Sequence, residues 1–117
     1  MAQVLTRIDV EVAAAGTAVR VVTDPASPLR YQPYAYFEAN FGNAGAIYVG
    51  GADVSDAAYT ALLNGNAVDR SFNWSAYNYP ASPNPQMRNQ TFVDLYETWV
   101  DAATSGDKVF VTISPNQ

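Results

Sequence analysis

Short hydrophobic runs separated by turn residues form the main pattern along this chain. Segment 7–12 alternates apolar and polar residues strictly, and in segment 108–113 Val109, Val111 and Ile113 share one face. A period of two is typical of a β-strand with one buried face. The residues predicted to face the core from these two strands are Ile8, Val10, Val12, Val109, Val111 and Ile113. The pattern therefore predicts one half-buried strand toward each end of the sequence.

Further short segments rich in apolar and aromatic residues lie between these two strands. The additional predicted strands are 19–22, 34–40, 47–49, 71–77 and 95–102. A turn at Gly16 joins 7–12 to 19–22, and we expect these two strands to pair as a hairpin. Seven or eight short strands with such connections predict an all-β domain in which two sheets pack as a β-sandwich or jelly roll.

One segment, 55–66, departs from the strand pattern. Ser55 is a good N-cap, the following alanines and leucines favour a helix, and Asn64 with Gly65 can close a helix in a left-handed conformation. These signals predict a short helix at 56–63.

The segment 78–89 contains three prolines and has no periodicity, which predicts a long loop. Large apolar side chains on such a loop have no evident core to enter and favour contact with another protein. The candidate interface residues are Tyr77, Tyr79, Pro80, Pro83, Pro85 and Met87. We expect a single β-sandwich domain over 1–117, with residues 1–6 available as an N-terminal arm.

Glycines line the stretch 42–55 and raise the question of a phosphate site. The segment 45–50 matches half of a P-loop, but Gly51 and Ala52 stand where a lysine and a hydroxyl residue are required. We interpret the glycines as turn residues that allow the chain to change direction sharply before and after the short strand 47–49. The turn residues are Gly42, Asn43, Gly45, Gly50 and Gly51.

Composition removes several classes of function. The 117 residues include no cysteine and no histidine, so thiolate and imidazole ligands and the nucleophile systems that use them are missing. The net charge is -5, and the six basic residues are scattered, which argues against a surface that follows phosphates. No stretch approaches a membrane span, and no signal peptide is evident. We expect no nucleic-acid partner, no membrane partner and synthesis in the cytoplasm.

Carboxylates are the remaining reactive groups. Asp53 lies near Asp56, and Asp101 lies near Asp107, so either pair could contribute to a calcium site or to acid–base work on a glycosidic bond. The spacing of an EF-hand is missing, and aspartates in turns commonly accept hydrogen bonds from nearby backbone. We favour capping roles, and expect no catalytic residue, no metal site and no cofactor.

Ten of the aromatic residues permit two interpretations. Aromatic side chains on alternating strands commonly fill the core, but they also form stacking platforms for sugars. We favour the core for those on the predicted strands and keep a carbohydrate-binding surface as the alternative. The residues are Tyr31, Tyr34, Tyr36, Phe37, Trp74, Tyr77, Tyr79, Phe92, Tyr96 and Trp99.

Three pieces of the sequence occur in a distinctive order. RIDVEVAAAGTAVRV is followed by ANFGNAGAIYVGGADVS and then by DLYETWVDAATSGDKVFVTI. This order resembles small virion proteins of tailed bacteriophages, which pair an N-x-G-x-IYVG turn and strand with a late DL…VDA…GD-x-V-x-V strand pair. The matching residues are Asn43, Gly45, Ile47, Tyr48, Val49, Gly50, Asp94, Leu95, Val100, Asp101, Gly106, Asp107, Val109 and Val111. Residues 56–90 depart from the family pattern.

The resemblance implies a non-enzymatic β-sandwich that decorates or cements a capsid by binding the major capsid protein. It assigns structural turns to Gly106 and Asp107 and catalysis to none of the matching residues. Charged residues make up 15% of the chain against about 25% in soluble domains, so we expect part of the surface to be covered by protein. A homo-oligomer, most simply a trimer, on the virion exterior fits these features. The alternative is a carbohydrate-binding module of a head fibre or receptor-contacting protein.

Overall fold

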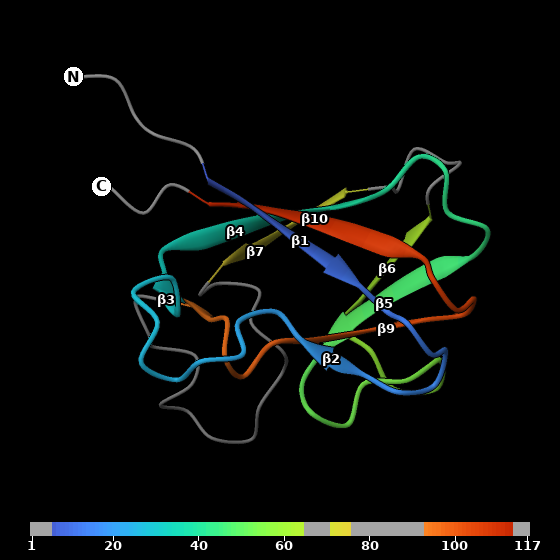
Figure 1. The fold of residues 1–117 in the computed structure, drawn as a ribbon, viewed down its shortest axis with the longest axis horizontal. Helices are drawn as coiled ribbons and strands as arrows, with labels where there is room; N and C mark the ends of the chain where they lie inside the picture. Colours follow the sequence, from blue (N-terminus) through green and yellow to red (C-terminus); the bar gives the residue numbers. More distant parts are fainter. Residues whose placement is uncertain (1–5, 65–70, 76–92, 114–117) are drawn as a thin grey trace.

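The described part of the chain is built of β-strands. The computed structural model describes residues 6–64, 71–75 and 93–113, and these residues form ten strands and no helix (Figure 1). They accordingly include no helix that is long and apolar enough to span a membrane. The strands are β1 (Thr6–Glu11), β2 (Val19–Arg20), β3 (Tyr31–Gln32), β4 (Tyr34–Ala39), β5 (Ala46–Gly50), β6 (Ala61–Asn64), β7 (Ser71–Ser75), β8 (Val93–Asp94), β9 (Trp99–Ala102) and β10 (Lys108–Ile113). The prediction of an all-β fold is confirmed for the residues that the structure describes.

The strands pair as one nested ribbon. β1 pairs with β10, β2 with β9, β3 with β8, β4 with β7 and β5 with β6, and every pair is antiparallel. Two further antiparallel pairs, β10 with β4 and β9 with β5, fold the ribbon onto itself. The result is sheet A, in the order β1-β10-β4-β7, sheet B, in the order β2-β9-β5-β6, and the two-stranded sheet C of β3 and β8. Figure 1 shows β1, β10 and β4 above β2, β5 and β9.

One hydrophobic cluster contains buried side chains from both four-stranded sheets. The alternation predicted for β1 and β10 is confirmed, because Val10, Val12, Val109, Val111 and Ile113 are buried. Sheet A contributes Val10, Ala35, Phe37, Ala39, Val109, Val111 and Ile113, and sheet B contributes Ile47, Val49, Leu63, Val100 and Ala102. The removal of this apolar surface from water is the main force that holds the two sheets in place.

The predicted hairpin between 7–12 and 19–22 is wrong. β1 belongs to sheet A and β2 to sheet B, so the turn at Gly16 carries the chain from one sheet to the other. The chain crosses between the sheets again from β4 to β5 and from β9 to β10. Alternation determines which face of a strand is buried, but it does not determine which strand lies beside it.

The predicted helix at 56–63 is also wrong. Ser55 and Ala58 form an isolated antiparallel bridge, closed by hydrogen bonds of 2.9 and 3.2 Å between their backbones. The chain then enters β6, where Ala61–Asn64 pairs with β5. The physical reason is that a helix of two turns is marginal by itself, whereas the strand gains ladder hydrogen bonds and buries Leu63, which is 1% exposed.

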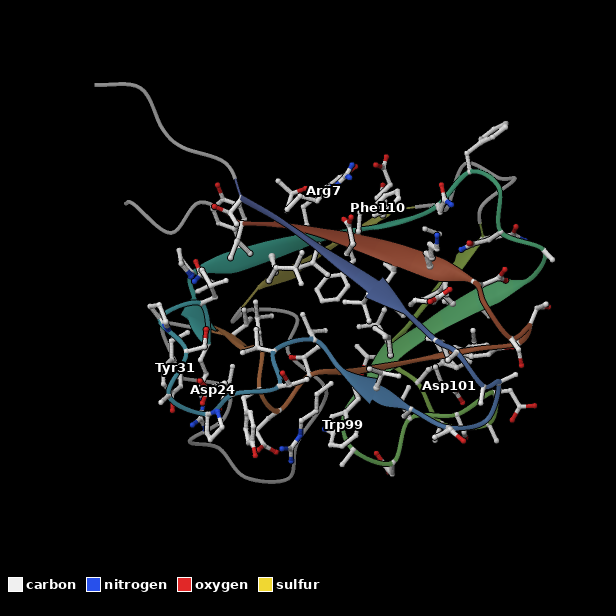
Figure 2. All side chains as sticks on the ribbon, viewed as in Figure 1. Arg7, Asp24, Tyr31, Trp99, Asp101 and Phe110 are labelled. Carbon is white, nitrogen blue, oxygen red and sulfur yellow. The ribbon has the colours of Figure 1, made fainter. Side chains whose placement is uncertain are left out.

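Charged and aromatic side chains share the outer face of sheet A. The Nε of Arg7 lies 2.8 Å from the Oδ1 of Asp9, and both side chains are more than half exposed. The guanidinium of Arg7 also lies over the ring of Phe110, with its Cζ 4.5 Å from the ring centroid (Figure 2). This face is therefore solvated.

Candidate functional site

The residues predicted for an interface lie outside the part of the chain that the structure describes. This holds for Tyr77, Tyr79, Pro80, Pro83, Pro85 and Met87, for the loop 78–89 that carries them and for most of the proposed arm at 1–6. The predicted turn residues, in contrast, are all described. Gly50 is the last residue of β5, and the others lie in the connections on either side of β5 and in the turn between β9 and β10.

Asn43 and Asp107 join these two connections. The Oδ1 and Oδ2 atoms of Asp107 accept hydrogen bonds from the backbone amides of Ala44 (3.0 Å) and Gly45 (2.8 Å). The Nδ2 of Asn43 donates to the carbonyl oxygen of Lys108 (2.7 Å), and the Lys108 amide donates to the Oδ1 of Asn43 (2.9 Å). Both side chains are buried. We call this set of four hydrogen bonds the 43–107 clasp, and it is structural.

Close packing explains two of the predicted turn glycines. A Cβ on Gly45 would lie 2.8 Å from the Oγ1 of Thr104, and a Cβ on Gly50 would lie 3.1 Å from the Cγ2 of Val54. Among the described residues, positive φ angles occur at Gly16 (89°) and Gly106 (90°). A left-handed backbone therefore occurs in the β1–β2 and β9–β10 connections, whereas Gly45 and Gly50 are needed for space.

Two arginines and three aromatic rings form a continuous row of contacts. The Cζ of Arg30 lies 4.8 Å from the ring centroid of Tyr31 and 4.9 Å from that of Tyr96. The Cζ of Arg20 lies 3.8 Å from the centroid of Tyr96 and 4.7 Å from that of Trp99. We call these five residues the arginine–aromatic row. It leads from Tyr31 in β3 to Trp99 in β9.

The two arginines of the row differ in their ion pairs. Arg30 makes a bidentate pair with Asp94, with Nε to Oδ1 and Nη2 to Oδ2 distances of 2.8 Å. These hydrogen bonds raise the pKa of Arg30 above its ordinary value. Arg20 pairs with no described carboxylate. Its Nε and the Nε1 of Trp99 are buried and have no hydrogen-bond partner, so cation–π contacts are the main support for this guanidinium within the described residues.

A cavity lies on the other side of the molecule from Tyr31. It has a volume of about 320 Å³ and is lined by residues of the β1–β2 connection, β5, the 51–60 connection and β9. The lining residues are Ala15, Gly16, Tyr48, Ser55, Asp56, Asp101, Ala102 and Ala103. Figure 2 shows Asp101 and Tyr31 at opposite ends, with Trp99 between them.

Asp101 holds the rim of this cavity. It is 2% exposed, and its Oδ1 accepts hydrogen bonds from the backbone amides of Gly16 (2.9 Å) and Ala102 (2.8 Å). Tyr48 is opposite Asp101 in the pairing of β5 with β9, and its ring packs on that of Tyr59 with centroids 5.3 Å apart. Burial, followed by the carboxylate of Asp56, raises the pKa of the Tyr48 hydroxyl, with smaller contributions from Tyr59 and Asp101.

The four aspartates considered from the sequence are not brought together as a reactive centre. Asp101 and Asp107 bind backbone amides of segments far away in the sequence, so they act as caps between connections. Asp53 and Asp56 are exposed on the 51–60 connection. No cluster of three or more potential metal-ligating side chains is found among the described residues. Asp101 and Asp107 are therefore arranged to hold backbone in place.

Of the aromatic side chains that the structure describes on the predicted strands 34–40 and 95–102, most lie outside the core, against the interpretation favoured from the sequence. Phe37 is fully buried, but Tyr31 is 56% exposed and Tyr36 40% exposed, and Tyr34, Tyr96 and Trp99 are half-buried. Aliphatic residues fill the core instead. Sequence reasoning missed the arginine–aromatic row because its members come from distant segments. Arg30 next to Tyr31, and Tyr96 close to Trp99, were the available signals.

Comparison of the chain with models of known protein families, with curated protein sequences and with solved structures finds no match.

Proposed function

We propose that sheets A and B form a β-sandwich of jelly-roll type and that the chain is a non-enzymatic structural protein of a bacteriophage virion. The nested pairing is the observation that carries this proposal. Five antiparallel pairs wind from β1 with β10 at the outside to β5 with β6 at the tip, which is what a rolled-up ribbon requires. Eight strands in two sheets with this winding are typical of jelly rolls, a fold used by viral capsid and lectin domains.

The 43–107 clasp supports the resemblance to small phage virion proteins. The two motifs on which the resemblance rests are far apart in the sequence. Within the clasp, Gly45 of the first motif binds Asp107 of the second, and Asn43 binds the backbone of Lys108, which follows Asp107 in the second motif. Residues that match because they hold a fold together need no catalytic role. The motifs are therefore explained by architecture.

The surface supports a role in binding other proteins. Phe41 is 70% exposed, Tyr31 56% and Tyr59 46%, while charged residues are scarce in the chain. Interfaces are enriched in aromatic residues and arginine, which describes the arginine–aromatic row. We propose that the chain binds the major capsid protein on the outside of the capsid as a decoration or cement subunit, and that it does so as a homotrimer.

Particle binding and solution mass test this proposal together. Purified chain is mixed with particles of its phage that lack it, sedimented, and quantified by mass spectrometry, while native mass spectrometry gives the oligomeric state. We expect saturable binding, with a number of bound copies per particle that matches the symmetry of the capsid, and a trimer in solution. A Trp99→Ala variant should bind more weakly, whereas Arg7→Ala, on the solvated face of sheet A, should bind as the wild type does. A monomer that never sediments with particles contradicts the proposal.

A carbohydrate-binding module is the second candidate, favoured by the exposed ring of Tyr31 at the end of the arginine–aromatic row. An aromatic ring open to solvent can stack on the apolar face of a sugar. This candidate would be supported if the chain binds glycans on an array, loses that binding in the Tyr31→Ala variant, and does not bind capsids.

A further inference from the structure

The cavity beside Asp101 is lined by polar groups for which the described fold provides no partner. Asp101 is 2% exposed, and both of its hydrogen bonds go to Oδ1. Its Oδ2 accepts no hydrogen bond from a described residue. Tyr48 is 9% exposed, lines the same cavity and makes no hydrogen bond with any described residue. Among the described residues, the fully buried side-chain atoms without a partner are the Nε of Arg20 and the Nε1 of Trp99. The Oδ2 of Asp101 and the Tyr48 hydroxyl are therefore open to the cavity that their residues line, where a ligand can bind them.

The charge of the cavity favours a cation. Asp56 and Asp101 contribute two carboxylates to its lining, and no described lining residue is basic. The raised pKa of Tyr48, caused by burial and then by Asp56, agrees with a negative potential in this space. Such a potential disfavours phosphates and other anions. A ligand that donates hydrogen bonds and carries positive charge satisfies both carboxylates.

The shape and composition of the cavity distinguish between kinds of cation. A calcium ion takes six to eight oxygen ligands, but the described residues contain no group of three potential metal-ligating side chains. The volume of the cavity is about 320 Å³, and the side chain of Tyr48 forms part of its wall. A guanidinium stacks on aromatic rings and presents a fork of donors that matches a carboxylate, whereas an ammonium is a compact and strongly hydrated point charge.

We propose that this cavity binds the guanidinium of an arginine that a partner protein presents, with Asp101 and Asp56 as acceptors and Tyr48 as the stacking wall. The arginine side chain enters between the β1–β2 connection and the 51–60 connection. The identity of the partner as the capsid protein rests on the proposed function. The assignment of the cavity to a guanidinium is independent of the proposed function.

Amide chemical shifts of the full chain, labelled with ¹⁵N, test the proposal with methylguanidinium chloride as the probe. We expect saturable shifts at Gly16, Ala102 and Ala103, with a dissociation constant on the order of millimolar, as befits so small a ligand. Methylammonium chloride at the same ionic strength should bind more weakly. Asp56→Asn should weaken methylguanidinium binding several-fold, and Asp101→Asn by roughly tenfold, the loss of one charge-assisted hydrogen bond.

The matched control is Asp53→Asn, an exposed aspartate of the same connection that does not line the cavity, and it should bind as the wild type does. Because Asp101 also supports Gly16, its variant can lose the fold; Asp56→Asn then carries the test. Absence of saturable shifts with methylguanidinium overturns the proposal. So does equal binding of methylammonium, or a response of these amides to methyl glucoside in its place.

The outcome is separable from that of the proposed function. Binding of methylguanidinium by a chain that never joins particles would keep the cavity assignment and contradict the capsid role. If the chain binds particles but its cavity does not bind methylguanidinium, the capsid role is kept and the cavity assignment is contradicted.

Discussion

At the residue scale, Asp107 links two connections that the sequence separates by more than sixty positions. Its carboxylate accepts hydrogen bonds from the amides of Ala44 and Gly45 in a buried setting. Replacing it with alanine leaves both amides without this acceptor, so Asp107→Ala should lower the free energy of unfolding by about 2–3 kcal/mol. Urea denaturation measures the change. Asp53→Ala removes an exposed aspartate and should stay within about 0.5 kcal/mol; similar losses in the two variants would contradict the capping role.

Gly45 offers a test of close packing at the same place. A Cβ there would lie 2.8 Å from the Oγ1 of Thr104 and 3.2 Å from the Cβ of Ala103. Gly45→Ala should therefore destabilise the fold by about 1–3 kcal/mol, and adding Thr104→Ala should restore part of the loss. Gly42→Ala, whose new Cβ would have its nearest neighbour at 4.0 Å, is the control in thermal melts. The absence of any rescue would show that the backbone, and not Thr104, limits the site.

Tyr48 gives a pH dependence with a definite sign. Burial, and then Asp56, raises the pKa of its hydroxyl above the ordinary 10.0. The folded chain therefore holds this proton more tightly than the unfolded chain does, so stability is unaffected at neutral pH and falls as the pH rises above about 10. Tyr48→Phe should make this fall less steep in denaturation curves. An identical slope in the variant would be evidence against the shifted pKa.

What the sequence predicts about single residues is their role, and what it leaves open is their partner. Asp101 and Asp107 bind backbone amides, as expected, and Asp101 accepts one of its hydrogen bonds from the neighbouring Ala102 amide, as aspartates in turns commonly do. Both aspartates, however, also bind backbone far away in the sequence. Asp101 reaches Gly16, and Asp107 reaches Ala44. No local pattern encodes such contacts, because they exist only after the sheets have assembled. The cavity beside Asp101 was unpredictable for the same reason.

At the element scale, β6 is the place where local propensity and tertiary structure disagree. Leu63 is 1% exposed, while its neighbour Leu62 is half-buried. As strand neighbours, these side chains point to opposite faces. Leu63→Ala should cost about 2–5 kcal/mol and Leu62→Ala clearly less, as measured by chemical denaturation. Comparable losses at both positions would contradict the strand.

Strands with a clear alternation were predictable, and short strands were not. β1 and β10 follow their pattern along their whole length. β3 and β8 have two residues each, too few for any periodicity. The predicted strand at 95–102 begins at Trp99 instead, because Asp94 holds the preceding residues in a turn. Its Oδ1 accepts a hydrogen bond from the Tyr96 amide, and its carbonyl oxygen accepts one from the Thr98 hydroxyl.

At the scale of the whole molecule, the nested pairing orders the strands by the length of chain that each pair encloses. β5 and β6 enclose only the 51–60 connection, whereas Thr6 of β1 faces Ile113 of β10 across nearly the whole chain. The entropy cost of closure grows with the enclosed length. Formation of the β5–β6 pair shortens the loop that the next pair must close. The fold should therefore assemble from its tip outward, and its many non-local pairs place folding in the range of milliseconds to seconds.

Folding kinetics test this order. Leu63→Ala at the tip should slow folding, with a φ-value above about 0.5, because its contacts are already formed in the transition state. Val10→Ala in β1, a buried residue of the outermost pair, should mainly speed unfolding, with a φ-value below about 0.3. Stopped-flow measurements over a range of urea concentrations give both values. The opposite pattern would mean that the two ends of the chain meet first, since only early contact between β1 and β10 can make Val10 rate-limiting.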